Sequence, residues 1–211
     1  DMEIIQQSTN TLILKIDNPS AISLYLNSIT KDNILFDLID CIYFDNFETI
    51  ESISEKLYIS ESTLKRYLTH LKKVLKKYNL FVQLTPYVTI IGDEATIRYF
   101  YFKYFRYVHD KSTLPIRVDL SQAIFETISS ISRDMGFALN VDHPRASYWT
   151  AIVEHRVRNG HHIILNDSIL ETHQHSASFS KFKKYFKLNF KSNSILSSLS
   201  HSELVYAFII R

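Results

Sequence analysis

The chain has 211 residues, of which 45% are hydrophobic and 22% charged, as expected for a globular protein of one or two domains with a buried core. Its formal net charge of +2 gives no general argument for nucleic-acid binding, so any such argument must come from local charge. Three glycines and four prolines are few for a sheet-rich protein, which favours a mainly α fold.

The first predicted helix spans residues 34–44. Its apolar residues recur at steps of three and four and share one face, namely Leu35, Leu38, Ile39 and Ile42. The single cysteine, Cys41, lies beside this face, so we expect a buried thiol. A lone cysteine without a partner is typical of a cytoplasmic protein.

The segment from 47 to 78, FETIESISEKLYISESTLKRYLTHLKKVLKKY, predicts a helix, a short turn and a second, basic helix. Ile50, Ile53 and Leu57 form the apolar stripe of the first helix. Ser60 is placed to cap the second helix by accepting a hydrogen bond from the backbone N–H of Ser62 or Thr63. The buried stripe of the second helix is expected to contain Leu64, Leu68, Leu71, Leu75 and Tyr78.

Local charge separates these helices. Residues 32–58 hold seven acidic side chains and one lysine, whereas residues 60–78 hold six basic side chains and one glutamate. A helix with a packed inner face and a cationic outer face suits the major groove of DNA. The predicted DNA-binding set contains Ser60, Ser62, Thr63, Lys65, Arg66, Thr69, His70, Lys72 and Lys73. Within it Arg66 is the best candidate for a guanine contact, and the later lysines, with Lys76 and Lys77, suit phosphates or solvent.

Two short β-prone runs follow, at residues 80–84 and 88–91, separated by the turn-compatible sequence Thr85-Pro86-Tyr87. Three helices and a hairpin in this order predict a winged helix-turn-helix domain over residues 31–92. The alternative is an ordinary amphipathic helical hairpin whose charged face is only solvated.

Residues 92–108, GDEATIRYFYFKYFRYV, predict an aromatic-rich helix that Asp93 caps. Such a helix could present a stacking platform for bases, lie on a membrane surface, or be buried on most sides. A helix that is apolar nearly all round is normally buried, which favours a buried connector over residues 93–112.

The rest of the chain, residues 113–211, has helical periodicity. We expect helices at 119–135, 145–159, 179–190 and from 202 onward, forming an all-α bundle that the end of the chain truncates. One helix carries five lysines, Lys181, Lys183, Lys184, Lys187 and Lys191. A solvated amphipathic face is favoured there over a second DNA contact.

Two stretches, TIESISEKLYISESTLKRYLTHLKKVLKKYNL and VTIIGDEATIRYFYFKYF, resemble the Mga/AtxA class of virulence gene regulators of low-GC Gram-positive bacteria. The resemblance covers about residues 12–211. It implies two winged-helix modules, two helical domains like those of phosphotransferase-system regulation, and a domain like a sugar-transport enzyme IIB. Residues 1–30 would then be a remnant of the first module, with its last strand at 11–16, and residues 113–211 the first regulation domain. It also implies gene activation and a homodimer.

In that class, histidine phosphorylation couples sugar supply to transcription, with a phosphocarrier as partner. The acceptor pattern of related antiterminators would place its two histidines where this chain has Trp149 and Ile210. His155, His161 and His162 remain as candidate phosphorylation sites, and a surface or capping role is the alternative for each.

Other chemistry is weakly supported. His161-His162 and His173-x-His175 lack the partners of a metal site, and no phosphate loop or nucleophile motif occurs, so we expect no metal, no cofactor and no enzyme. No apolar run is long enough for a membrane span and no signal peptide is visible. The absence of methionine at position 1 suggests a piece of a longer protein.

The sequence therefore predicts a cytoplasmic transcriptional regulator that reads double-stranded DNA with the helix at 60–77, and activates virulence or carbohydrate-linked genes under control of the helical domain. The alternatives are an RNA-binding antiterminator and a protein-interaction module whose winged helix does not bind nucleic acid.

Overall fold

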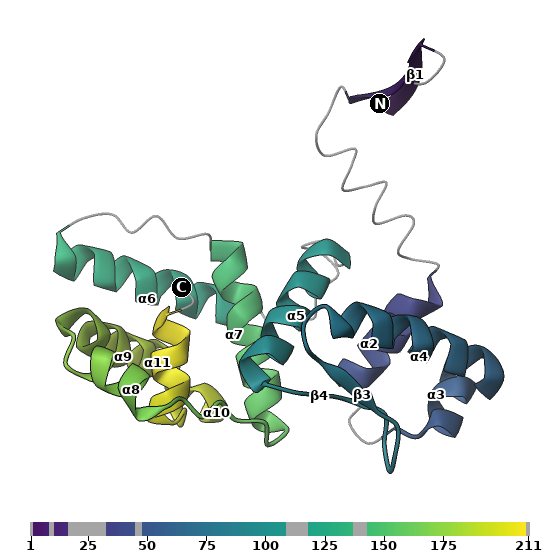
Figure 1. The fold of residues 1–211 in the computed structure, drawn as a ribbon. Coiled ribbons are helices and arrows are strands. Elements are labelled where there is room, and N and C mark those ends of the chain that lie inside the picture. The colour runs from purple at the N-terminus through teal and green to yellow at the C-terminus, as the bar shows by residue number, and fades with distance from the viewer. Residues whose placement is uncertain are drawn as a thin grey trace. The chain divides into compact units, whose positions relative to one another are not determined.

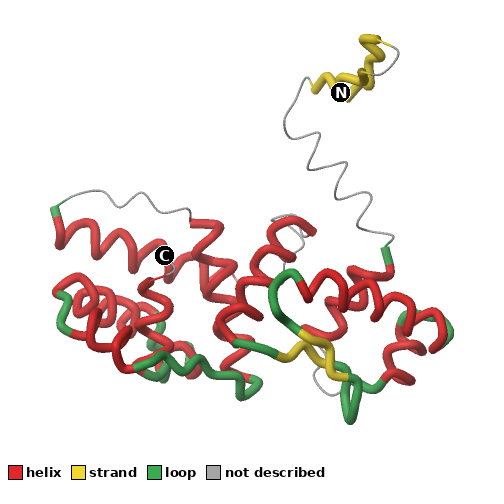
Figure 2. The backbone as a smooth tube through the Cα atoms, viewed as in Figure 1, coloured by secondary structure: helices red, strands yellow, loops and turns green. Residues whose placement is uncertain are grey.

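The computed structural model describes residues 2–8, 11–16, 33–44, 48–108, 118–136 and 143–209. These residues are mainly helical, as predicted (Figures 1 and 2). The chain divides into two compact units. Unit 1 contains Asp1–Ile91 and Lys103–Leu114, and unit 2 contains Gly92–Phe102 and Pro115–Arg211, so the division falls within helix α5 (Glu94–Val108).

Unit 1 begins with a two-stranded antiparallel hairpin of β1 (Met2–Ser8) and β2 (Thr11–Ile16), in which Ile5 lies opposite Ile13. The second strand coincides with the one that the family resemblance implies. The first strand was not predicted from the sequence.

Three helices follow in unit 1: α2 (Ile34–Phe44), α3 (Ile50–Lys56) and α4 (Glu61–Lys76). Helices α2 and α3 both pack on α4, and their core residues are Leu38, Ile39, Ile42, Tyr43 and Ile53. The predicted apolar faces are confirmed at their central residues. Leu35, Cys41, Ile50 and Leu57 are only half-buried, which corrects their assignment.

The hairpin after α4 consists of β3 (Phe81–Gln83) and β4 (Thr89–Ile91), which are shorter than predicted and pair antiparallel. It is attached to the rest of unit 1 at two points. The backbone N–H of Val88 donates to the carbonyl oxygen of Glu48 at 2.8 Å, and β3 packs against α4. Three helices and a hairpin therefore form the predicted winged helix-turn-helix arrangement.

The later residues of α5 complete the core of unit 1. The hydroxyl of Tyr104 lies 2.9 Å from both the carbonyl oxygen of Phe36 and Oδ1 of Asp40 on α2. The ring of Phe105 meets that of Tyr43 edge to face, with centroids 4.7 Å apart. These contacts fix α2 against α5, so the aromatic residues serve as core.

The earlier residues of α5 belong to the core of unit 2. Asp93 caps the helix as predicted, with its Oδ2 accepting a hydrogen bond from the N–H of Thr96 at 2.8 Å. Phe102 stacks on Trp149 with centroids 4.6 Å apart and planes at 10°. Only Tyr99 among the described aromatic residues of α5 is substantially exposed, at 44%. The prediction that α5 is buried on most sides is therefore confirmed, and the helix does not present a stacking platform for bases. No described helix is both long and apolar enough to cross a membrane.

Unit 2 also contains six further helices within its described residues. They are α6 (Val118–Met135), α7 (His143–Arg158), α8 (Asp167–Gln174), α9 (Ala177–Asn189), α10 (Ser194–Ser197) and α11 (His201–Ile209). Helices α6, α7, α9 and α11 match the predicted positions within a few residues. The short helices α8 and α10 were not predicted. Phenylalanines of α9 occupy the centre of the core, where α6, α8, α10 and α11 pack against α9.

Candidate nucleic-acid interface

The turn between α3 and α4 positions the start of the basic helix. Helix α3 ends in a Schellman motif: the N–H of Ile59 donates to the carbonyl of Ser54 at 3.0 Å, and Tyr58 has a φ of 52°. Helix α4 then begins at the cap predicted from the sequence. Ser60 has an extended backbone, and its Oγ accepts a hydrogen bond from the N–H of Thr63 at 3.2 Å. The two helices are thus joined by only a few fixed residues.

The inner face of α4 is fully packed. Leu64, Leu68, Leu71 and Leu75 are all buried, as predicted from their spacing. Tyr78 is half-buried and lies beyond the end of the helix, which corrects its assignment to the buried stripe. Four buried leucines along one face hold the rotation of α4 about its axis, so its other faces are fixed toward solvent.

The outer face of α4 carries polar and basic side chains. Ser62, Arg66 and Thr69 each precede a buried leucine by two residues, and 200° of helical rotation places them nearly opposite the core. Further along, exposed bases line this surface. We call the exposed polar and basic positions that follow Glu61 on α4, together with the C-cap, the outer face; its members are Ser62, Lys65, Arg66, Thr69, His70, Lys72, Lys73, Lys76 and Lys77.

Two members of the predicted set have local roles at the start of α4. Ser60 is the cap itself, and its Oγ is 3.0 Å from Thr63 Oγ1 and 2.8 Å from Ser62 Oγ. Thr63 is half-buried. The structure therefore leaves Ser62 as the first exposed hydroxyl of the outer face and uses Ser60 and Thr63 to begin the helix.

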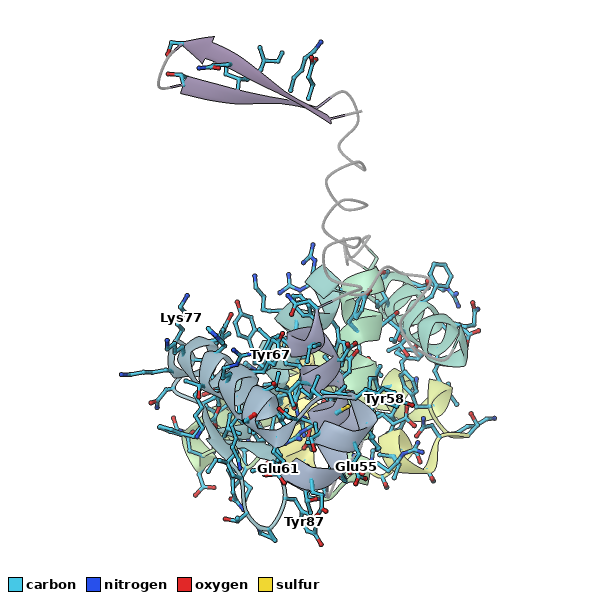
Figure 3. All side chains as sticks on the ribbon, turned by 90° about the vertical axis from the view of Figure 1, so that its right-hand side faces the viewer. Glu55, Tyr58, Glu61, Tyr67, Lys77 and Tyr87 are labelled. Atoms are coloured by element: carbon cyan, nitrogen blue, oxygen red, sulfur yellow. The ribbon has the colours of Figure 1, made fainter. Side chains whose placement is uncertain are left out.

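Charge changes along α4. Lys65 Nζ lies 3.0 Å from Glu61, with both side chains about half exposed, so the pair contributes little to stability. Beyond Arg66 the outer face contains only basic or neutral residues. Figure 3 shows Glu61 and Lys77 at opposite ends of the helix. The negative end of the helix dipole also lies toward Lys77, so the cations stabilise α4 as well as create a positive surface.

The β3–β4 hairpin differs from the outer face because residues 80–91 contain no charged side chain. Tyr87 lies in its loop (Figure 3) and is 39% exposed. Any contribution of the hairpin to phosphate binding must come from hydroxyl and backbone groups, which leaves α4 as the source of positive charge in this part of unit 1.

Tyr58 combines an unfavourable backbone with an exposed side chain. Tyr58 is 96% exposed, and its left-handed φ is a conformation that glycine or asparagine adopts more easily. The same capping motif ends α4 with Asn79 and α7 with Gly160. We expect Tyr58→Asn to raise the free energy of unfolding of unit 1 by about 0.5–1 kcal/mol. Urea denaturation measures this change, and a lower midpoint for the variant would show that the tyrosine stabilises the turn.

Unit 2 contains a buried ionic network that the sequence did not reveal. Arg98 and Glu203 are both 0% exposed and form a bidentate pair, with Nη1–Oε2 at 2.6 Å and Nη2–Oε1 at 2.8 Å. Glu203 Oε1 also accepts the N–H of Ile163 at 2.8 Å. Glu94 joins the network through Arg98 Nε at 2.9 Å and through two bonds from Arg156, at 2.7 and 3.0 Å. The sequence held one signal of this network, because Glu94 and Arg98 lie four residues apart on the aromatic-rich helix α5.

The charges of this network set the ionisation of its members. Burial raises the pKa of Glu94, but the hydrogen bonds and charges of Arg156 and Arg98 outweigh burial and hold that pKa below its ordinary value. Burial of Tyr206, whose ring lies 5.7 Å from the Arg98 guanidinium, raises its pKa.

The three candidate histidines lie at or just beyond the end of α7. His155 Nε2 is 3.0 Å from Asn159 Nδ2. His161 is half-buried, and its carbonyl oxygen accepts a hydrogen bond from Arg98 Nη2 at 3.1 Å. His162 is exposed. The structure thus brings one of them, His161, to the ionic network.

The environment of His161 predicts a pH dependence. Burial, followed by the charge of Arg156, lowers its pKa from 6.5; Arg98 and His155 lower it further, and Glu94 opposes them. The unfolded chain therefore binds a proton below about pH 6.5 that the folded chain does not. We expect unit 2 to lose stability as the pH falls from 6.5 toward the pKa of His161 in the folded chain. The His161→Gln variant should lose less stability over the same range.

Urea unfolding at several pH values between 7.5 and 5 tests this expectation. His162→Gln is the matched control, because it removes an imidazole from the neighbouring exposed position. The prediction is wrong if His161→Gln and the wild type lose stability equally across this range.

Comparison with known proteins agrees with this geometry. Residues 19–105 match the sequence model of the Mga helix-turn-helix domain, which confirms the resemblance to the Mga/AtxA class. Over 160 residues, the chain is 29% identical to a protein of Streptococcus pneumoniae serotype 4 that is named as a trans-acting regulator. The match covers 75% of this chain and 32% of that protein. The chain is 23% identical over 185 residues, or 82% of its length, to the capsule synthesis positive regulator AcpB of Bacillus anthracis, covering 38% of that protein.

The capsule synthesis positive regulator AcpA of the same organism is 21% identical over 180 residues, which cover 83% of this chain and 37% of AcpA. The chain spans about a third of the length of these curated relatives. The helix-turn-helix match contains α2, α3, α4 and the hairpin, and its described part therefore includes the whole outer face.

Proposed function

We propose, from the membership of residues 19–105 in the Mga helix-turn-helix family, that this chain is the DNA-binding part of a transcription regulator and that α4 enters the major groove. The observation that carries the proposal is the outer face: nine exposed polar or basic positions turned away from a fully buried leucine stripe. An α-helix fits the major groove, and a cationic helix is attracted to the phosphates beside it.

We assign different roles to the two parts of the outer face. Ser62, Arg66 and Thr69 lie on the first half of α4 and carry groups that can hydrogen-bond to base edges, Arg66 bidentately to guanine. Lys72, Lys73, Lys76 and Lys77 lie on its second half and suit phosphates, because a lysine is a compact charge without fixed geometry. Ser60 and Thr63 position the helix.

The finer parts of the proposal concern the whole protein. By analogy with the names of AcpA and AcpB, we propose positive regulation of target genes, in the cytoplasm, by a homodimer. We further propose that residues 1–30 are a remnant of a preceding module and that residues 31–92 form the DNA-binding domain. A connector at 93–112 would join it to the regulatory domain at 113–211, on which a phosphocarrier would act.

Equilibrium binding measured by fluorescence anisotropy tests the assignment of α4. The wild-type chain is titrated onto AT-rich and mixed-sequence duplexes across a salt series, beside Lys65→Ala/Arg66→Ala. Five or six phosphate contacts predict a log–log slope of about −5 for the wild type. Loss of the Arg66 contact predicts affinity lower by at least roughly tenfold on a preferred sequence.

The matched control is Arg106→Ala/Arg133→Ala, which removes the same charge from exposed positions outside α4. If the control and the α4 variant weaken binding equally, only net charge matters and α4 is not the reader. Tighter binding to hairpin RNA than to duplex DNA would instead support the antiterminator alternative.

A further inference from the structure

A second cationic surface lies on α9, in unit 2. Between Glu171 and Glu203 the sequence contains no acidic residue and five lysines, Lys181, Lys183, Lys184, Lys187 and Lys191. No other lysine occurs after Lys111. A general lysine-rich composition would have spread these residues through unit 2, so their concentration within eleven positions needs a local reason.

The structure separates the two faces of α9. Phe179, Phe182 and Phe186 are buried in the core of unit 2, and Phe190 follows at the cap. Four of the five lysines, at 183, 184, 187 and 191, are exposed on the other side, beside the exposed hydroxyl group of Ser180. The inner phenylalanines fix the rotation of the helix, as the leucines do in α4, so the lysines are held toward solvent.

These charges are not compensated locally. Lys183 and Lys187 are four residues apart on α9, so their ammonium groups repel one another, and Lys191 follows just beyond the helix. In the part of the chain that the structure describes, none of these three lysines forms an ion pair. The nearby acidic residue Asp134, on α6, is already engaged by α9. Its carboxylate accepts a hydrogen bond from the hydroxyl of Tyr185, and its backbone carbonyl oxygen accepts one from Lys181 Nζ at 2.9 Å.

We propose that the exposed lysine face of α9 binds the phosphate backbone of double-stranded DNA without reading its sequence. The choice of DNA as the polyanion rests on the proposed function of α4. Protein interfaces are rich in aromatic residues and arginine and poor in lysine, whereas the exposed positions of α9 hold neither aromatic residues nor arginine. Apart from Ala177 at its start, Leu188, which is 53% exposed, is the exposed apolar residue of α9.

The spacing of the lysines also suits a phosphate backbone. Four helical residues advance roughly 6 Å, so Lys183 and Lys187 can each meet a different phosphate of one strand. The face would add affinity and salt dependence to binding, while base recognition would remain with the first half of α4.

The test uses the full chain and a 60-base-pair duplex of mixed sequence in a salt series. We expect Lys183→Gln/Lys184→Gln/Lys187→Gln to reduce the log–log slope by about 2–3, corresponding to three lost phosphate contacts. Lys183→Arg/Lys184→Arg/Lys187→Arg should keep the wild-type slope, because it preserves the charge. All changes are at exposed positions, and an unchanged thermal midpoint confirms that unit 2 remains folded.

Including Lys65→Ala/Arg66→Ala separates this inference from the proposed function. If that variant weakens binding and the glutamine variant binds like the wild type, α4 is the reader and the α9 proposal is overturned, leaving an acidic protein as the partner to seek. If only the glutamine variant weakens binding, the α9 proposal holds and the assignment of α4 fails. A wild-type chain that binds no duplex at low salt contradicts both.

Discussion

Glu203→Ala is expected to lower the free energy of unfolding of unit 2 by about 3–5 kcal/mol, the largest effect of any single change considered for this unit. The substitution leaves the Arg98 guanidinium fully buried without its bidentate partner, and it also removes the acceptor for the N–H of Ile163. A charge in such a site must either remain uncompensated or draw water into the core. Urea unfolding followed by near-ultraviolet circular dichroism, which reports Trp149, measures the loss.

Two further variants show whether the ion pair itself is the cause. Glu171→Ala removes a carboxylate from an exposed position on α8 and should change stability by less than about 0.5 kcal/mol. Arg98→Met/Glu203→Leu removes both charges and should recover much of the loss, because an apolar pair of similar volume avoids the desolvation of either ion. A double variant as unstable as Glu203→Ala would mean that the shape of the site, rather than its charge, is decisive.

Leu71→Ala is expected to destabilise unit 1 by about 2–5 kcal/mol, because Leu71 is fully buried on the inner face of α4 and its loss leaves a cavity. The same cavity should loosen the rotation of α4 about its axis. We therefore expect weaker DNA binding from a variant that retains every side chain of the outer face. Thermal unfolding and anisotropy, both on the full chain, measure the two effects.

Val74→Ala is the matched control for this change. Val74 is on the same helix but is 38% exposed, so its truncation removes fewer packed atoms and should cost clearly less than Leu71→Ala. Equal losses for the two variants would contradict the assignment of the inner and outer faces of α4.

The basic helix could be predicted from the sequence because all its determinants are local. Ser60 caps it, leucines at steps of three and four bury one face, and polar and basic residues occupy most of the remaining positions. The hairpin was predictable for the same reason, from two β-prone runs around Thr85-Pro86. The exposure of the candidate site therefore followed from periodicity alone.

Other features depend on contacts that no local pattern shows. Arg98 and Glu203 are separated by 105 residues, so the sequence could not pair them. The left-handed backbone of Tyr58 was also hidden, because tyrosine is an unusual residue for that conformation. The helices α8 and α10 did leave a signal: Asn166 and Asn193 cap them with their side chains, but each helix is too short for a clear apolar repeat.

The structure also explains the Gly-Asp-Glu sequence in the second stretch that carries the resemblance. Gly92, with a φ of 149°, ends the hairpin, Asp93 caps α5, and Glu94 binds Arg98 and Arg156. These residues therefore begin α5 and secure it in the core of unit 2. They carry part of the resemblance without belonging to the candidate DNA-binding surface.

The most direct test of the central claim is dimethyl sulfate interference on a duplex selected by the wild-type chain from a random library. The reagent methylates guanine N7 in the major groove and adenine N3 in the minor groove, so it reports which groove α4 occupies. We predict interference at guanine N7 for the wild type, and the specific disappearance of one such position with Arg66→Ala. An identical pattern for both proteins, or interference only at adenine N3, would contradict reading of the major groove by α4.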